Sequence, residues 1–271
     1  MGVDGLTVSG AREARVDPRL SDRVVEALLL VGLPVAHGGH GPGVHLLPTG
    51  ADAAAGGSDP ERWPITLRWL CSARLEDAAA AGGDGPWPRT RQVVVDSLET
   101  ALAELLPSLG LRATRATSNG PTLVGPGADP GAGEADAPDA PGASGSVVAP
   151  TGAATLPADA VAAVRRSAAL AGLPLALGPR AAGVALAVCA PLQAEAAAAA
   201  ADAETGAAAD PVVDVAWRSS PQLPGSPPVA TAVREAMHHA VGTALTACGL
   251  RTSWHRPPDG PPHLHAADTR A

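Results

Sequence analysis

An internal repeat constrains the fold of this chain more than any other feature of its sequence. Residues 32–48 and 172–188 are identical at eight of 17 positions at a constant offset of 140, and most shared residues are Gly, Leu, Pro or Val. At an offset of 139, residues 110–112 match residues 249–251 as Gly-Leu-Arg. Because the order and spacing of the matches persist along the chain, we expect two copies of one folded unit.

Each Gly-Leu pair follows a pattern typical of an amphipathic helix. Before the second pair, apolar residues recur at spacings of three and four, at Val95, Leu98, Leu102, Leu105 and Leu109. Gly directly after such a stripe is a common helix end, because Gly accepts the left-handed backbone conformation there. The sequence therefore predicts four helices, which end at Gly32, Gly110, Gly172 and Gly249.

Extended segments and Gly-rich turns follow each predicted helix. A further strand precedes the second helix of each copy, over 65–71 and 212–217, and we expect Trp69 and Trp217 to occupy equivalent places. Each copy then reads α-β-β-β-α-β-β, and helices that cover an antiparallel sheet form a two-layer α+β unit. The predicted fold class is a tandem duplication of this unit.

The predicted domain boundaries follow the repeat. Residues 126–150 are rich in Gly, Pro, Ala and Asp and are expected to form a disordered acidic linker. On either side we expect an N-terminal tail, a first repeat, a second repeat and a C-terminal tail, over 1–19, 20–125, 151–267 and 268–271. Long surface loops are predicted over 49–62, 76–90 and 191–210.

The element order resembles that of type III secretion chaperone-like folds, including the YbjN-type domains of bacteria. The most similar stretch is the first helix with Gly32-Leu33, the hairpin that follows and Leu47-Pro48. The resemblance covers most of each half by order and rests on no specific motif. It implies a protein-binding role without catalysis, in which the duplication mimics a dimer.

Charge and residue usage exclude several classes of function. The net charge is −8 and Arg165-Arg166 is the one adjacent basic pair in the predicted folded parts, so we expect neither a nucleic-acid nor a membrane partner. The chain has no Lys, which excludes the Walker-type phosphate loop and a pyridoxal Schiff base. Cys71, Cys189 and Cys248 form no C-x-x-C motif, and no signal peptide is recognised, so a reducing cytoplasm is expected.

The absence of Phe, Tyr and Lys also concerns the origin of the chain. Ile65 and Asn119 are single occurrences of their types, and the rare residues are those with A/T-rich codons. A very GC-rich genome, such as that of an actinomycete, explains this usage. A translated frame that encodes no real protein is an alternative interpretation.

Histidine forms the only cluster that suggests chemistry. The candidates lie in two hairpins, His37 and His45 in the first and His255, His263 and His265 in the last. His263 and His265 share one face of a strand, and paired imidazoles suit Zn²⁺. A solvated loop explains the same residues, so no cofactor is the first expectation and Zn²⁺ the alternative.

Other polar residues are expected on solvated faces. These are Glu99 and Glu104 on the second helix and His238-His239 on the fourth, with Met237 on the buried stripe. No G-x-S-x-G or H-E-x-x-H motif occurs. The first functional hypothesis is therefore a non-catalytic interaction or chaperone-like protein of unknown partner, and the second is a metal-dependent enzyme or metal-binding protein that uses the hairpin histidines.

Overall fold

The structure, a computed structural model, describes residues 17–36, 41–49, 59, 61–83, 85–127, 156–178, 180–188, 212–223, 227–255 and 263–268. Nearly all of the predicted tails and linker, and the predicted loop over 191–210, lie outside the described residues.

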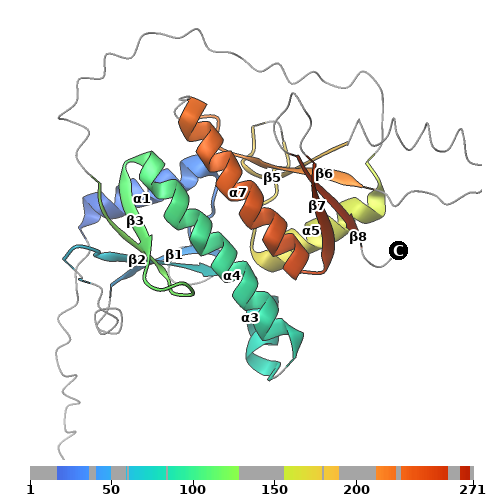
Figure 1. Ribbon diagram of the computed structural model, residues 1–271, viewed down its shortest axis with the longest axis horizontal. Coiled ribbons are helices and arrows are strands. Elements are labelled where there is room, and N and C mark those ends of the chain that lie inside the picture. The colour runs from blue at the N-terminus through green and yellow to red at the C-terminus, as the bar shows by residue number, and fades with distance from the viewer. Residues whose placement is uncertain are drawn as a thin grey trace, which may run out of the picture.

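Each repeat combines helices with one four-stranded sheet (Figure 1). The first contains α1 (Pro18–Val31), β1 (Gly43–Pro48), β2 (Ile65–Leu70), α3 (Ala73–Ala81), α4 (Pro86–Leu105), the 3₁₀ helix η1 (Leu106–Leu109), β3 (Leu111–Arg115) and β4 (Thr122–Pro126). The second contains α5 (Ala158–Ala171), β5 (Gly183–Val188), β6 (Val213–Arg218), α7 (Pro227–Ala247), β7 (Leu250–His255) and β8 (His263–Asp268). All strand pairs are antiparallel, in the orders β1-β2-β4-β3 and β5-β6-β8-β7. The predicted α+β fold class, with two similar sheet units, is confirmed.

Two details of the predicted element order differ from the structure. The first predicted strand of each repeat is only a single parallel bridge, Val35 to Val44 and Leu175 to Val184. Pro34 and Pro174 precede the bridging residues and lack the N–H that a longer ladder needs. The loop predicted over 76–90 is wrong as well, because α3 and the first residues of α4 occupy most of it.

The ends of α1 and α5 explain why the repeat preserves Gly-Leu. Gly32 and Gly172 have φ values of 93° and 81°, in the left-handed region that favours Gly. Each also lies against the other repeat. A Cβ on Gly32 would lie 2.6 Å from the Cβ of Ala182, and one on Gly172 would lie 2.9 Å from the Cβ of Pro42. Any larger residue would clash at the junction.

Two tryptophans make reciprocal hydrogen bonds across the same junction. The Nε1–H of Trp69 on β2 donates to the carbonyl oxygen of Ala171 at the end of α5, at 2.8 Å. The Nε1–H of Trp217 on β6 donates to the carbonyl oxygen of Val31 at the end of α1, also at 2.8 Å. Such an exchange of equivalent contacts is the pattern of a twofold-symmetric dimer. The two Trp residues occupy equivalent places, as the sequence predicts.

The two repeats share one hydrophobic core. The helices α4 and α7 pack side by side at its centre and bring Leu98, Leu102 and Leu105 together with Val233 and Met237. All five side chains are at most 1 % exposed. The core continues into both sheets, so neither repeat completes its packing without the other.

Candidate functional site

A groove runs between α4 and α7 on the surface of the chain. The two helices are antiparallel, because Thr90 near the start of α4 donates a hydrogen bond to the carbonyl oxygen of Ala247 at the end of α7. Two neighbouring cavities of about 650 Å³ and 290 Å³ share Val93, His239 and Thr243 in their walls. We call the two together the α4–α7 groove. It exists only because helices from both repeats meet.

The larger cavity lies at the β7 end of the groove. Its walls include Pro86, Arg89, Val93, His239, Thr243 and Trp254, and we call it the Trp254 pocket. The side chain of Trp254 projects from β7 and is 46 % exposed. Gly242 on α7 lies against the ring, because a Cβ there would be in ordinary van der Waals contact with the Cζ2 atom of Trp254, at 3.5 Å. The result is a concave site with an aromatic wall.

The smaller cavity lies on the internal twofold. It is bordered by three pairs of residues that an offset of 139 relates, namely Ser97 and Ala236, Thr100 and His239, and Glu104 and Thr243. The residues of each pair differ in chemistry. The two sides of this cavity are therefore equivalent in the repeat but carry unlike side chains.

Most hydroxyl groups in the Trp254 pocket already have hydrogen-bond partners. Thr246 donates to the carbonyl oxygen of Gly242 at 2.9 Å and contacts the hydroxyl of Thr252 at 2.6 Å, while Thr90 donates to α7. The side chains of Arg89, His239 and Thr243 make no hydrogen bond or ion pair with any residue that the structure describes. These three side chains are available to a ligand.

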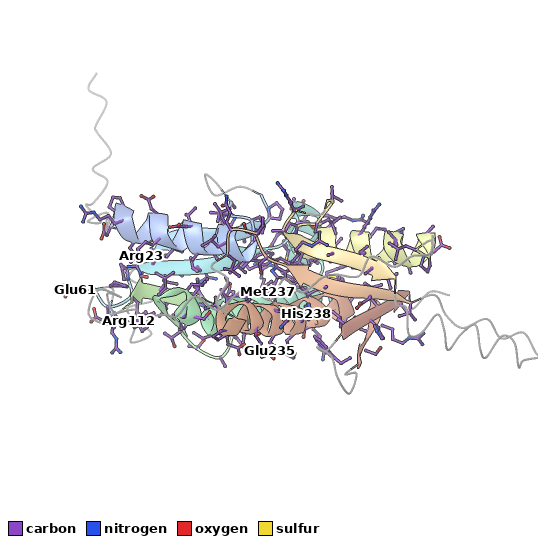
Figure 2. The ribbon with its side chains drawn as sticks, turned by 90° about the horizontal axis from the view of Figure 1, so that it is seen from above. Arg23, Glu61, Arg112, Glu235, Met237 and His238 are labelled. Carbon is purple, nitrogen blue, oxygen red and sulfur yellow. The ribbon has the colours of Figure 1, made fainter. Side chains whose placement is uncertain are left out.

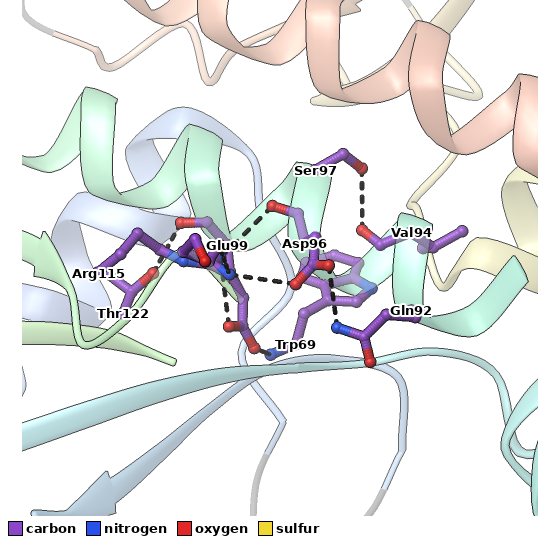
Figure 3. Close-up of polar contacts among 9 residues, drawn as sticks. Trp69, Gln92, Val94, Asp96, Ser97, Glu99, Arg115 and Thr122 are labelled. Atoms are coloured by element: carbon purple, nitrogen blue, oxygen red, sulfur yellow. Dashed lines mark hydrogen bonds and ion pairs between the residues drawn. The ribbon is translucent and has the colours of Figure 1, made fainter. Parts of the chain in front are cut away.

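A largely buried polar cluster lies between α4 and the first sheet, and one of its members, Asp96, borders the smaller cavity of the groove (Figure 3). The Oε1 atom of Glu99 accepts a hydrogen bond from the backbone N–H of Trp69 at 3.0 Å, and its Oε2 atom lies 3.4 Å from Arg115. Arg115 also pairs with Asp96 at 3.2 Å. Thr122 donates to the Glu99 carbonyl oxygen at 2.7 Å. The cluster joins α4 to β2, β3 and β4.

Glu99 corrects the expectation of a solvated face. Its side chain is buried because α4 packs against the sheet on one side and against α7 on another, so that more than one face of the helix is covered. Burial raises the pKa of the Glu99 carboxyl to about 7, while the Trp69 N–H and the Arg115 guanidinium act in the opposite direction. Glu104 is exposed, as expected.

The equivalent cluster in the second repeat is aromatic. The offset of 139 places His238 at the position of Glu99 and Trp254 at that of Arg115. The two rings lie 6.1 Å apart between centroids and are tilted by 46°. His238 is buried, which corrects the expectation of a solvent-facing side chain, whereas Met237 is buried and His239 exposed as predicted. Figure 2 shows Met237 and His238 on α7, with Glu235 toward the outside.

The predicted metal ligands are only partly described. His255 and His263 are direct cross-strand partners, but their side chains lie outside the described residues, as does His37. His265 is buried on β8 between Asp214 on β6 and Ser253 on β7.

The first hairpin does not lie near the last one. The Nε2 atom of His45 on β1 lies 3.0 Å from the carbonyl oxygen of Gly41. Figure 1 shows β1 and β8 on opposite sides of α4 and α7. Within the described part of the chain, no group of three or more His, Cys, Asp or Glu side chains is arranged to hold a metal ion.

The described thiols are not activated. Burial raises the pKa of Cys71 to about 12 and that of Cys248 to about 11, so both are protonated at neutral pH. Cys71 is buried and Cys248 is partly buried, whereas Cys189 lies outside the described residues.

Comparison with protein-family models, with curated proteins and with solved structures found no match. None of the helices in the described stretches is long and apolar enough to cross a membrane.

Proposed function

We propose that this chain is a non-catalytic protein-interaction module, and that the α4–α7 groove binds a segment of a partner protein. This is also the role that the resemblance to chaperone-like folds implies. The cytoplasm is the proposed location, in keeping with the free thiols of Cys71 and Cys248.

The half-exposed side chain of Trp254 at the end of the groove carries the proposal. An exposed Trp beside a cavity is typical of binding hot spots, because its ring buries a large apolar area when a partner covers it. At the equivalent position of the first repeat, Arg115 instead turns toward Asp96 and Glu99. The two copies therefore differ in chemistry at the position where the second one borders the groove.

The chemistry of the groove supports binding over catalysis. The carboxylate of Asp96 is paired with Arg115, and the thiols described above are protonated. The remaining polar groups of the groove are hydroxyls, His239, Arg89 and Glu104, spread over both cavities. Dispersed polar groups on two rigid helices suit recognition of an extended or helical segment.

The test uses peptides that are selected from a random display library for binding to the full chain. Thr243 borders both cavities, so Thr243→Arg fills the groove at its centre. Ala169→Arg places the same group on an exposed position of α5 and serves as the control. We expect selected peptides to bind the parent and the control equally and the groove variant at least tenfold more weakly in calorimetric titration. Peptides that bind all three proteins alike would contradict the proposal.

A further inference from the structure

We propose that the Trp254 pocket takes an apolar group that carries a carboxylate. The inference rests on the proposed function, since it assigns this group to the partner segment that the α4–α7 groove binds. Three independent features of the pocket lead to it, namely its charge, its available hydrogen-bonding groups and its apolar walls.

The charge of the pocket is opposite to that of the chain. The chain has a net charge of −8, yet the described walls of the Trp254 pocket hold Arg89 and no acidic side chain. Other arginines nearby are neutralised, Arg91 by Glu76 and Arg115 by Asp96. Arg89 pairs with no described residue. A positive group that has no partner among the described residues, at a cavity of an acidic protein, favours an anionic ligand.

The available hydrogen-bonding groups favour a ligand that accepts hydrogen bonds. The guanidinium of Arg89 can only donate, and the hydroxyl of Thr243 and the ring of His239 can also donate. Thr243 follows His239 by one helical turn, so both lie on the α7 face that borders the pocket. A carboxylate only accepts, and its planar shape matches the guanidinium.

The rest of the pocket is apolar and has room for a bulky group. Pro86, Val93 and the Trp254 ring form its walls, and its volume is about 650 Å³. Sites for small ligands have volumes of about 300–1,000 Å³ and are mostly apolar with few polar groups. An aromatic or branched aliphatic side chain therefore fits beside the carboxylate.

The opposite charges near the two ends of the α4–α7 groove also determine the direction in which the partner segment binds. Glu104 borders the smaller cavity, 15 positions after Arg89 on α4. At 1.5 Å per residue these positions are about 22 Å apart, a length that about seven residues of extended chain cover. The segment would place a basic residue near Glu104 and its apolar carboxylate in the Trp254 pocket.

The experiment compares ligands that differ only in charge. The probes are 4-phenylbutyrate and its neutral amide, 4-phenylbutanamide, titrated into the full ¹⁵N-labelled chain. The readout is the indole N–H signal of Trp254, assigned with Trp254→Phe. Arg89→Gln removes the pocket charge, and Arg165→Gln removes an exposed charge of α5 as a matched control. We expect a Kd of about 1 mM for the acid, at least tenfold weaker binding of the amide, and loss of this preference in Arg89→Gln alone.

Two results would overturn the carboxylate assignment. One is equal binding of acid and amide, and the other is a preference for the acid that persists in Arg89→Gln.

A second arm identifies the source of the carboxylate and separates this inference from the proposed function. It uses a seven-residue peptide with Arg first, Phe last and Gly and Ser between, as free acid and as amide. Displacement of phenylbutyrate by the acid form supports a partner segment. Binding of phenylbutyrate without displacement would assign the pocket to a free small carboxylate and overturn that source. Library peptides that bind in the groove without preferring a terminal carboxylate would overturn the inference and leave the proposed function standing.

Discussion

Replacement of Glu99 by Gln changes how the stability of the chain depends on pH. Burial raises the pKa of this carboxyl from 4.5 to about 7 in the folded chain. Between these two values the folded chain holds a proton that the unfolded chain has lost. The contribution of Glu99 to the free energy of unfolding is therefore fully present below pH 4.5 and is lost as the pH rises to about 7. The side chain is 2 % exposed, and the difference corresponds to about 3 kcal/mol of unfolding free energy.

The assay is urea denaturation of the parent and of Glu99→Gln over a range from about pH 4.5 to 8. The difference in unfolding free energy between parent and variant should fall by about 3 kcal/mol across this range, and Glu104→Gln, at an exposed position of the same helix, serves as the matched control. A flat difference for Glu99→Gln would refute the reasoning. The same assay shows whether the parent unfolds cooperatively. The absence of a cooperative transition would favour the interpretation that the chain is a translated frame that encodes no real protein.

Three further predictions concern the core, the junction and the hairpin histidines. Leu105 is fully buried, so Leu105→Ala should cost about 2–5 kcal/mol in urea denaturation; a loss below about 0.5 kcal/mol would contradict its position. Trp69→Phe and Trp217→Phe each leave a carbonyl oxygen without its donor, and we expect similar losses of about 1–3 kcal/mol, so that a large difference would argue against the internal twofold. Calorimetric titration with Zn²⁺ should show equal, weak binding in the parent and in His263→Ala/His265→Ala; stoichiometric binding that the variant loses would instead support the metal hypothesis.

The sequence predicted those features of the fold that depend on local chemistry. Helices α1 and α5 end directly at Gly, whereas α4 continues as the 3₁₀ helix η1 before Gly110 and α7 ends two residues before Gly249; all four glycines have the positive φ that the prediction requires. The stripe of Leu98, Leu102 and Leu105 follows from helical periodicity. The helix α3 was missed because its Ala-rich sequence has little amphipathic pattern; the better signal is Ser72, whose side chain caps its first turn.

The candidate site was harder to predict because it depends on tertiary contacts. Glu99 looks solvated on a helical wheel, and its burial follows from a sheet and a second helix that meet around α4. A signal was available, since the offset of 139 pairs Glu99 with His238 and Arg115 with Trp254. Such unlike residues at equivalent places of a repeat mark where the copies differ in role. The groove itself needs the packing of α4 against α7, which periodicity alone does not determine.

The reciprocal hydrogen bonds of the two tryptophans have a consequence for the chain while it is being synthesised. The carbonyl oxygen of Val31, at the end of the first helix, accepts its hydrogen bond from Trp217, which lies 186 residues later in the chain. A nascent chain that has emerged only as far as the first repeat must keep one face of that repeat open until β6 follows it from the ribosome. We therefore expect truncated or stalled chains to associate with one another through the junction, since a second copy of the first repeat offers Trp69 where the finished chain offers Trp217.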